Sequence, residues 1–216
     1  MKRTRLPANE RRAVILANAR AVFAQSGYEA ARTQEIARRS GVSEALMYRH
    51  FPSKEALYRA VLREVIKEQD ASYELLSLTE FNGRALVRNL RTYFAIVVGT
   101  EETAIKEGFR LLLASLASDR NFAKLVYRRA HRLMDHRFAQ ALQAARDAGD
   151  IRGHRISVRN TSLFSEHVGT VLNVLAAERE GSPYEGDAGE IVNDAVWFCC
   201  RAVGFTDEAI ERHLRD

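Results

Sequence analysis

Proline and glycine are scarce in this sequence of 216 residues, which holds three prolines and twelve glycines. Both residues end helices and build tight turns, so their scarcity favours long helices over many short strands. No apolar run approaches the roughly 18 residues of a membrane-spanning helix, and residues 1–5 lead into polar sequence rather than the apolar core of a signal peptide. We therefore expect an all-α protein that lies in the cytoplasm and does not enter a membrane.

Cysteine is limited to the adjacent pair Cys199 and Cys200, which fits neither a disulfide framework nor a four-ligand zinc site. Their apolar neighbours in the sequence indicate reduced core residues. The sequence also lacks a Gly-x-Ser-x-Gly elbow, a phosphate-binding glycine loop and a Cys-x-x-Cys motif. His131 and Asp135 have the spacing of metal ligands on a helix, but no third ligand is placed beside them. We therefore expect no enzyme activity, no cofactor and no bound metal.

Positive charge is concentrated at one end of the chain. Residues 1–56 carry eleven Lys or Arg and five Asp or Glu, a net charge of +6, whereas residues 57–216 carry a net charge of −1. A short cationic module joined to a nearly neutral remainder indicates a polyanion as the partner of that module. The alternative is an uneven surface that is merely solvated.

Apolar residues recur at three- and four-residue spacing along most of the chain, which predicts a series of helices. Small polar residues stand where many of these helices should begin and can serve as their N-caps. The first helix is expected to end at Gly27. Two further helices are expected at about 105–116 and 158–179, and a short one after Thr206. The predicted N-caps are Asn9, Thr33, Ser43, Ser53, Asn82, Asp119 and Asp187.

Residues 33–51 fit the pattern of a helix-turn-helix, in which Gly41 supplies the left-handed exit from the first of two short helices. At about 100° per residue, Met47 and Phe51 of the second helix point inward together. The opposite surface combines small, apolar, aromatic and cationic side chains, which suits base edges and phosphates better than open water. Its residues are Ala45, Leu46, Tyr48 and Arg49.

The segment 41–57, GVSEALMYRHFPSKEAL, resembles the signature of the TetR-type repressors. The upstream segments 23–28, FAQSGY, and 33–37, TQEIA, match the same family, so the strong resemblance covers about residues 10–65. Met47 replaces the leucine usual in the family, an apolar exchange of similar volume. The resemblance implies a homeodomain-like helix-turn-helix domain in residues 1–56 and a helical effector-binding and dimerisation domain in residues 57–216, with a connecting helix over 54–70.

The resemblance also implies which residues of the N-terminal module contact DNA. Residues at helix N-termini have free N–H groups that favour phosphate, and a lysine adds a full charge. The implied contacts to the DNA backbone are Thr33, Ser43, Tyr48, His50 and Lys54. Base reading would fall to Glu44, Ala45, Leu46 and Arg49, because arginine can bind guanine, glutamate can accept from cytosine and an apolar group can touch a thymine methyl. Alternative roles remain open for five of these residues: helix capping for Thr33 and Ser43, packing against its neighbours for His50, stabilisation of the helix dipole for Glu44 and a phosphate contact for Arg49.

The last two long helices of the family form a four-helix dimer interface, and this chain has apolar residues at helical spacing in both of them. The resemblance therefore implies a homodimer and an operator with inverted repeats. Packing within the monomer is the alternative for these residues. They are Phe164, Val168, Val171, Leu172, Leu175, Val192, Val196, Trp197 and Cys200.

The helices between residues 82 and 142 are where the family binds a small-molecule effector. Core packing explains the same apolar residues equally well. The candidates are Phe94, Phe109, Leu112, Leu116, Tyr127, His131 and Met134. The basic run 127–132, YRRAHR, could favour an anionic effector, although its arginines cannot all face inward.

Taken together, the residues and the resemblance predict a transcriptional regulator, expected to repress, that binds palindromic operator DNA as a dimer and is released by an unidentified small molecule. The alternative is a helical ligand-binding or adaptor dimer without DNA binding. The second is disfavoured because the cationic module keeps each expected backbone-contacting residue.

Overall fold

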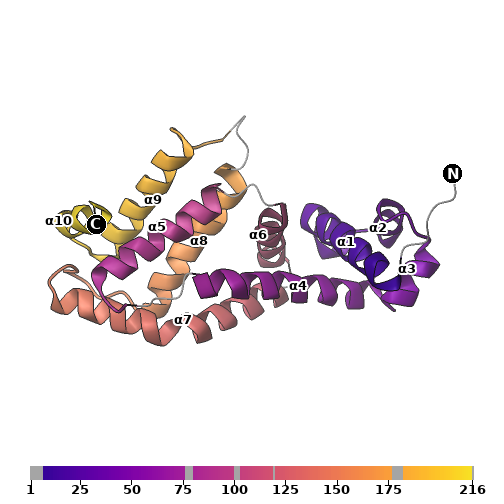
Figure 1. Ribbon diagram of the computed structural model, residues 1–216, viewed down its shortest axis with the longest axis horizontal. Helices are drawn as coiled ribbons and strands as arrows, with labels where there is room; N and C mark the ends of the chain where they lie inside the picture. The colour runs from indigo at the N-terminus through magenta and orange to yellow at the C-terminus, as the bar shows by residue number, and fades with distance from the viewer. Residues whose placement is uncertain (1–6, 76–79, 100–102, 119, 177–181, 216) are drawn as a thin grey trace. The chain divides into compact units, whose positions relative to one another are not determined.

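The computed structural model describes residues 7–75, 80–99, 103–118, 120–176 and 182–215, and within them the side chains other than those of 71–75, 103, 104, 131, 133–135 and 176 (Figure 1). These ranges form ten α-helices and one isolated bridge between Ile151 and Phe205, which confirms the all-α prediction. The helices are α1 (Ala8–Ala30), α2 (Thr33–Arg39), α3 (Glu44–His50), α4 (Lys54–Leu75), α5 (Gly83–Gly99), α6 (Thr103–Leu116), α7 (Asn121–Asp147), α8 (Val158–Ala176), α9 (Ala188–Val203) and α10 (Asp207–Arg215). None of them, over the described residues, has the length and hydropathy of a membrane span.

The helices fall into two compact units. The first comprises Met1–Asp70 and Thr103–Ala123, and the second comprises Ala71–Glu102 and Lys124–Asp216. The first unit therefore extends beyond the predicted module of residues 1–56, because most of α4 and all of α6 pack with the N-terminal helices.

The core of the first unit forms where α1 packs against α6 and α2. Ile15 and Phe23 of α1, Ile36 of α2 and Leu57 of α4 are each fully buried in it. Burial of such side chains contributes roughly 1.5–3 kcal/mol apiece. The short helices α2 and α3 are thereby fixed on a scaffold of longer ones.

One charged residue lies within this core. The Arg20 guanidinium of α1 donates two hydrogen bonds of 2.7 Å to the Glu68 carboxylate of α4. Its Nε also lies 3.2 Å from Glu107 of α6, and burial raises the pKa of the Glu107 carboxyl. Arg20 thus joins three helices of the first unit through two ion pairs, which no local pattern in the sequence predicts.

Local hydrogen bonds to side chains explain where several of the helices begin. The side chains of Ser43, Ser53, Asn82 and Asp187 accept from backbone N–H groups three residues ahead, as predicted. The helix α1 is interrupted at Gly27, because the φ of 72° at this glycine lies outside the right-handed helical region.

Two predicted caps are wrong. Pro7 precedes α1 in place of Asn9, since proline suits the start of a helix, where its missing N–H is not needed. Arg32 precedes α2 in place of Thr33, whose hydroxyl instead bonds to Glu44. The predicted cap Asp119 lies outside the described residues.

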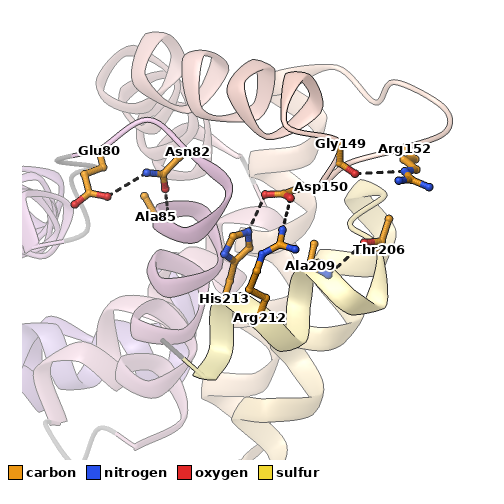
Figure 2. A network of polar contacts seen from close by, with 10 residues as sticks. All are labelled: Glu80, Asn82, Ala85, Gly149, Asp150, Arg152, Thr206, Ala209, Arg212 and His213. Atoms are coloured by element: carbon orange, nitrogen blue, oxygen red, sulfur yellow. Dashed lines mark hydrogen bonds and ion pairs between the residues drawn. The ribbon is translucent and has the colours of Figure 1, made fainter.

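In the second unit, α5 is the central helix and packs on α8, α9 and α10. Figure 2 shows how the loop after α7 holds the C-terminal helix. The Asp150 carboxylate, which is 7% exposed, accepts from Arg212 at 2.5 Å and from His213 at 2.8 Å, both from α10. Its backbone carbonyl accepts from the Thr206 N–H at 2.9 Å. This polar cluster closes the end of the unit where α5 begins.

Candidate functional site

The helix α3 has one buried and one exposed surface. Met47 and the following Phe51 are 1% and 3% exposed, so they anchor the helix in the first unit as predicted. Ala45 and Arg49 are exposed, and Tyr48 is 39% exposed. Leu46 lies partly exposed beside them. The helix therefore offers a short surface of mixed chemistry to an external partner.

A chain of hydroxyl hydrogen bonds links α3 to α2. The Tyr48 hydroxyl donates to Thr33 Oγ1 at 3.2 Å, and the Thr33 hydroxyl donates to the Glu44 carboxylate at 2.8 Å. This relay holds the two helices in register and orients Tyr48 at the edge of the exposed surface. A base contact by Glu44 would compete with the hydrogen bond that it accepts from Thr33.

The polar groups beside α3 are held by local contacts. The Ser43 side chain accepts from the Leu46 N–H at 3.2 Å, which leaves its hydroxyl proton free to point outward. The Lys54 ammonium donates to the Glu29 carbonyl at 3.0 Å and lies 4.8 Å from the centre of the Tyr28 ring. His50 is partly exposed at the end of α3. Each predicted backbone-contacting residue of the helix-turn-helix is thus at least partly exposed.

Several cations near α3 were not singled out from the sequence. The Arg12 guanidinium of α1 lies 4.3 Å from the centre of the Phe51 ring. Arg32 and Arg38 line a hollow of about 680 Å³ beside α2, together with Gln34, Glu35, Ala37, Val42 and Glu44. The basic excess of residues 1–56 was the available signal for these arginines, but charge alone does not say which of them surround the helix.

The residues proposed for a dimer interface fall into three groups by their exposure. Phe164, Val171 and Leu175 of α8 are 57%, 42% and 38% exposed. Leu172, Val196 and Cys200 are buried in the core of the second unit, so they pack within the chain itself. Val168, Val192 and Trp197 are partly exposed. Phe198 of α9, which is not among the predicted interface residues, is 64% exposed.

The effector candidates do not gather within one unit. Phe109, Leu112 and Leu116 belong to α6 of the first unit, whereas Phe94 of α5 and Tyr127 of α7 belong to the second. Leu112 and Phe94 are fully buried. The side chains of His131 and Met134 lie outside the described residues. In the basic run of α7, Arg128 and Arg132 are exposed and therefore face solvent.

Comparison with known proteins connects this architecture to a family. Residues 15–61 match the family model for bacterial regulatory proteins of the tetR family. Over 109 residues the chain is 38% identical to the HTH-type transcriptional activator FasR of Mycolicibacterium smegmatis, a match covering 50% of this chain and 48% of FasR. The chain thus spans about half the length of this curated relative.

Solved structures resemble the chain over most of its length. A tetR-family regulatory protein from Rhodococcus RHA1 gives a TM-score of 0.66 at 23% identity, over 92% of this chain and 99% of that protein. AibR, solved in complex with isovaleryl coenzyme A and operator DNA, gives a TM-score of 0.65 at 17% identity, over 87% and 97%. The fold is therefore shared with these proteins, and residues 15–61 of the chain match the N-terminal domain of the tetR family of bacterial regulatory proteins.

Proposed function

We propose that this protein is a cytoplasmic transcriptional regulator whose helix α3 enters the major groove of operator DNA. The observation that carries the proposal is the exposed surface of α3, where Tyr48 and Arg49 project from a helix anchored by Met47 and Phe51. Arginine can contact guanine, and the hydroxyl and ammonium groups of Tyr48 and Lys54 can bind phosphate. FasR, the relative with 38% identity, is described as a transcriptional activator of the helix-turn-helix type.

The protein is further proposed to act as a homodimer. Phe164 and Val171 of α8 and Phe198 of α9 are exposed apolar side chains, and the protein gains stability if a second copy covers them. A two-fold dimer presents two copies of α3, so the operator is proposed to be an inverted repeat.

A small-molecule effector is proposed to release the protein from DNA, and DNA binding is proposed to repress transcription. Release requires that the effector bind the DNA-incompetent arrangement more tightly than the DNA-bound one. AibR, which has a similar fold, was solved with both isovaleryl coenzyme A and operator DNA, so it is a precedent for a protein of this fold that binds a small molecule and DNA. A promoter fusion in cells with and without the gene tests the sign of regulation, and repression predicts higher expression without it.

DNA binding is tested by fluorescence anisotropy with the intergenic DNA upstream of the gene and with random duplex, at low and high salt. A Tyr48→Ala/Lys54→Ala double variant removes two proposed phosphate contacts. The matched control is Tyr184→Ala/Lys124→Ala, because both of those residues are exposed on the second unit. We expect selective, salt-sensitive binding by the wild type and the control, and a loss of at least about tenfold in the first variant.

Two results would contradict the proposed function. Binding that does not depend on salt would exclude phosphate contacts as its main source. Equal affinities of the two double variants would exclude the surface around α3 as the DNA contact. In either case the helical adaptor without DNA binding would become the better description.

A further inference from the structure

The helix α1 brings a cation to the C-terminal end of α3 (Figure 1). The Arg12 guanidinium lies over the Phe51 ring, 4.3 Å from its centre. Phe51 directly follows α3, which ends at His50, and is only 3% exposed, so the core of the first unit fixes the position of its ring. Arg12 is therefore held beside α3 although it belongs to a different helix.

The charge of Arg12 is not neutralised in the way that the charge of several other arginines in the first unit is. Arg20, Arg39 and Arg59 each form an ion pair with a glutamate. Arg12 forms no ion pair within the described part of the chain, and its side chain is exposed. Its positive charge thus remains available to an external anion.

A ring is a suitable support for a cation that binds such an anion. It attracts the guanidinium electrostatically but leaves the net positive charge in place. The guanidinium carries five N–H donors in a flat fork whose geometry matches the oxygens of a phosphate. Contact with the ring also restricts a long side chain before the anion arrives, which lowers the entropy that is lost on binding.

A second cation near α3 is held in a similar way. The Lys54 ammonium lies 4.8 Å from the centre of the Tyr28 ring and donates to the Glu29 carbonyl at 3.0 Å. The Tyr28 ring packs in turn against Tyr58, with 4.8 Å between the ring centres. An ammonium has three N–H donors, so the carbonyl leaves others for a phosphate. Arg12 and Lys54 thus combine an undiminished charge with a fixed position.

The neighbours of Arg12 favour a nucleic-acid backbone as its anion. The Phe51 ring that supports it directly follows His50, which is one of the residues with a proposed phosphate contact. The surrounding module of residues 1–56 carries a net charge of +6. A closely spaced row of phosphates can engage several such cations at once, whereas a single small anion engages only one or two.

We propose that Arg12 binds a phosphate of the DNA backbone and extends the DNA contact from α3 to α1, with Phe51 as the residue that positions it. This inference rests on the proposed function, because it adds a contact to the same protein–DNA complex. Contacts to phosphate carry no sequence information. Arg12 should therefore strengthen binding to every duplex and leave the preference for the operator unchanged.

The test is fluorescence anisotropy of the full chain with the upstream intergenic duplex and with random duplex, between about 50 and about 200 mM salt. Arg12→Gln removes the charge, and the matched control Arg155→Gln removes the same charge from an exposed position of the second unit. One phosphate contact contributes about 0.9 to the slope of log affinity against log salt concentration.

Arg12→Gln should lower this slope by about 0.9 on both duplexes. Its affinity should fall about tenfold at the low salt concentration and about threefold at the high one, because salt weakens the contact that the wild type retains. Arg12→Lys keeps the charge without the planar fork, so it should keep the slope and lose less affinity than Arg12→Gln. Arg155→Gln should keep both the slope and the affinity of the wild type.

A double-mutant cycle tests whether Phe51 acts through Arg12. Phe51→Leu removes the ring and keeps an apolar side chain, and Phe51→Met takes its place if thermal unfolding shows that the first variant is not folded. A positioning role predicts a lower salt slope in the wild-type background and no further decrease in the Arg12→Gln background. A merely structural role predicts the same loss of affinity in both backgrounds, which would overturn the role of Phe51.

An unchanged salt slope in Arg12→Gln, or an equal decrease in Arg155→Gln, would overturn the proposed contact. A loss confined to the upstream duplex would overturn it as well, because a phosphate contact does not distinguish sequences. If the wild type binds DNA with salt dependence and Arg12→Gln is unchanged, Arg12 is no contact and the regulator stands. If the wild type itself shows no salt-dependent binding to either duplex, the proposed function fails together with this inference.

Discussion

At the scale of single residues, Glu166 should make the stability of the protein depend on pH. Its folded pKa of about 7 lies above the ordinary value of 4.5, so ionisation is less favourable in the folded than in the unfolded chain. The wild type should therefore lose up to about 3 kcal/mol of unfolding free energy, relative to Glu166→Gln, as the pH rises from about 4.5 to about 7. Urea unfolding of both proteins at several pH values measures the difference.

The comparison with Glu166→Gln removes the contributions of all other titrating groups. The two proteins should be similarly stable at the acid end of the range, and the variant should be the more stable one above neutrality. A constant difference at every pH would mean that Glu166 is not desolvated in the folded protein.

At the scale of elements, the Arg20 cluster should stabilise the packing of α1 against α4 and α6. Arg20→Ala removes the guanidinium that lies 3.2 Å from the Glu107 carboxylate, whose side chain is 15% exposed, and leaves that carboxylate the weaker attraction of Arg110. Removing one partner of a buried pair costs roughly 3–5 kcal/mol, so the variant should be destabilised by about 3 kcal/mol. Thermal or urea unfolding measures this loss.

Glu68 provides the control for Arg20, since its side chain is 46% exposed. Glu68→Gln should cost less than about 1 kcal/mol, because the Glu68 side chain is largely solvated and Arg20 keeps its ion pair with Glu107. Equal losses in the two variants would argue that the cluster contributes through side-chain packing and not through its charges.

Elements defined by local chemistry were the most predictable from the sequence. The caps Ser43, Ser53, Asn82 and Asp187 act on N–H groups three residues away, so sequence spacing is enough to find them. Arg20 and Glu68 are separated by 48 positions, and no local pattern pairs them. Their ion pair is a product of tertiary packing, which brings α1 and α4 together.

The candidate sites differ in predictability for the same reason. Helical periodicity correctly placed Met47 and Phe51 inside, because one face of a short helix is enough to anchor it. On α8, periodicity marked both Leu172 and Val171, yet the first is buried and the second is 42% exposed. When a helix carries more apolar residues than its own core can bury, sequence periodicity does not show which of them stay exposed and available to a partner.

At the scale of the whole molecule, the exposed apolar residues of α8 and α9 predict that self-association controls DNA affinity. Phe198 is 64% exposed, so Phe198→Glu should leave the fold of the monomer intact while placing a charge in the proposed interface. Sedimentation should then show a monomer where the wild type is a dimer. Operator affinity should fall by at least about tenfold, because a monomer engages only one half of an inverted repeat.

Phe81→Glu is the matched control, since Phe81 is also exposed, at 43%, but lies just before α5 and outside the proposed interface. It should remain a dimer with the operator affinity of the wild type. A Phe198→Glu protein that stays dimeric would place the interface elsewhere, whereas a monomer with full operator affinity would separate dimerisation from DNA binding. Because both variants add the same charge to an exposed phenylalanine, a difference between them reports the position of the residue and not the loss of an aromatic ring.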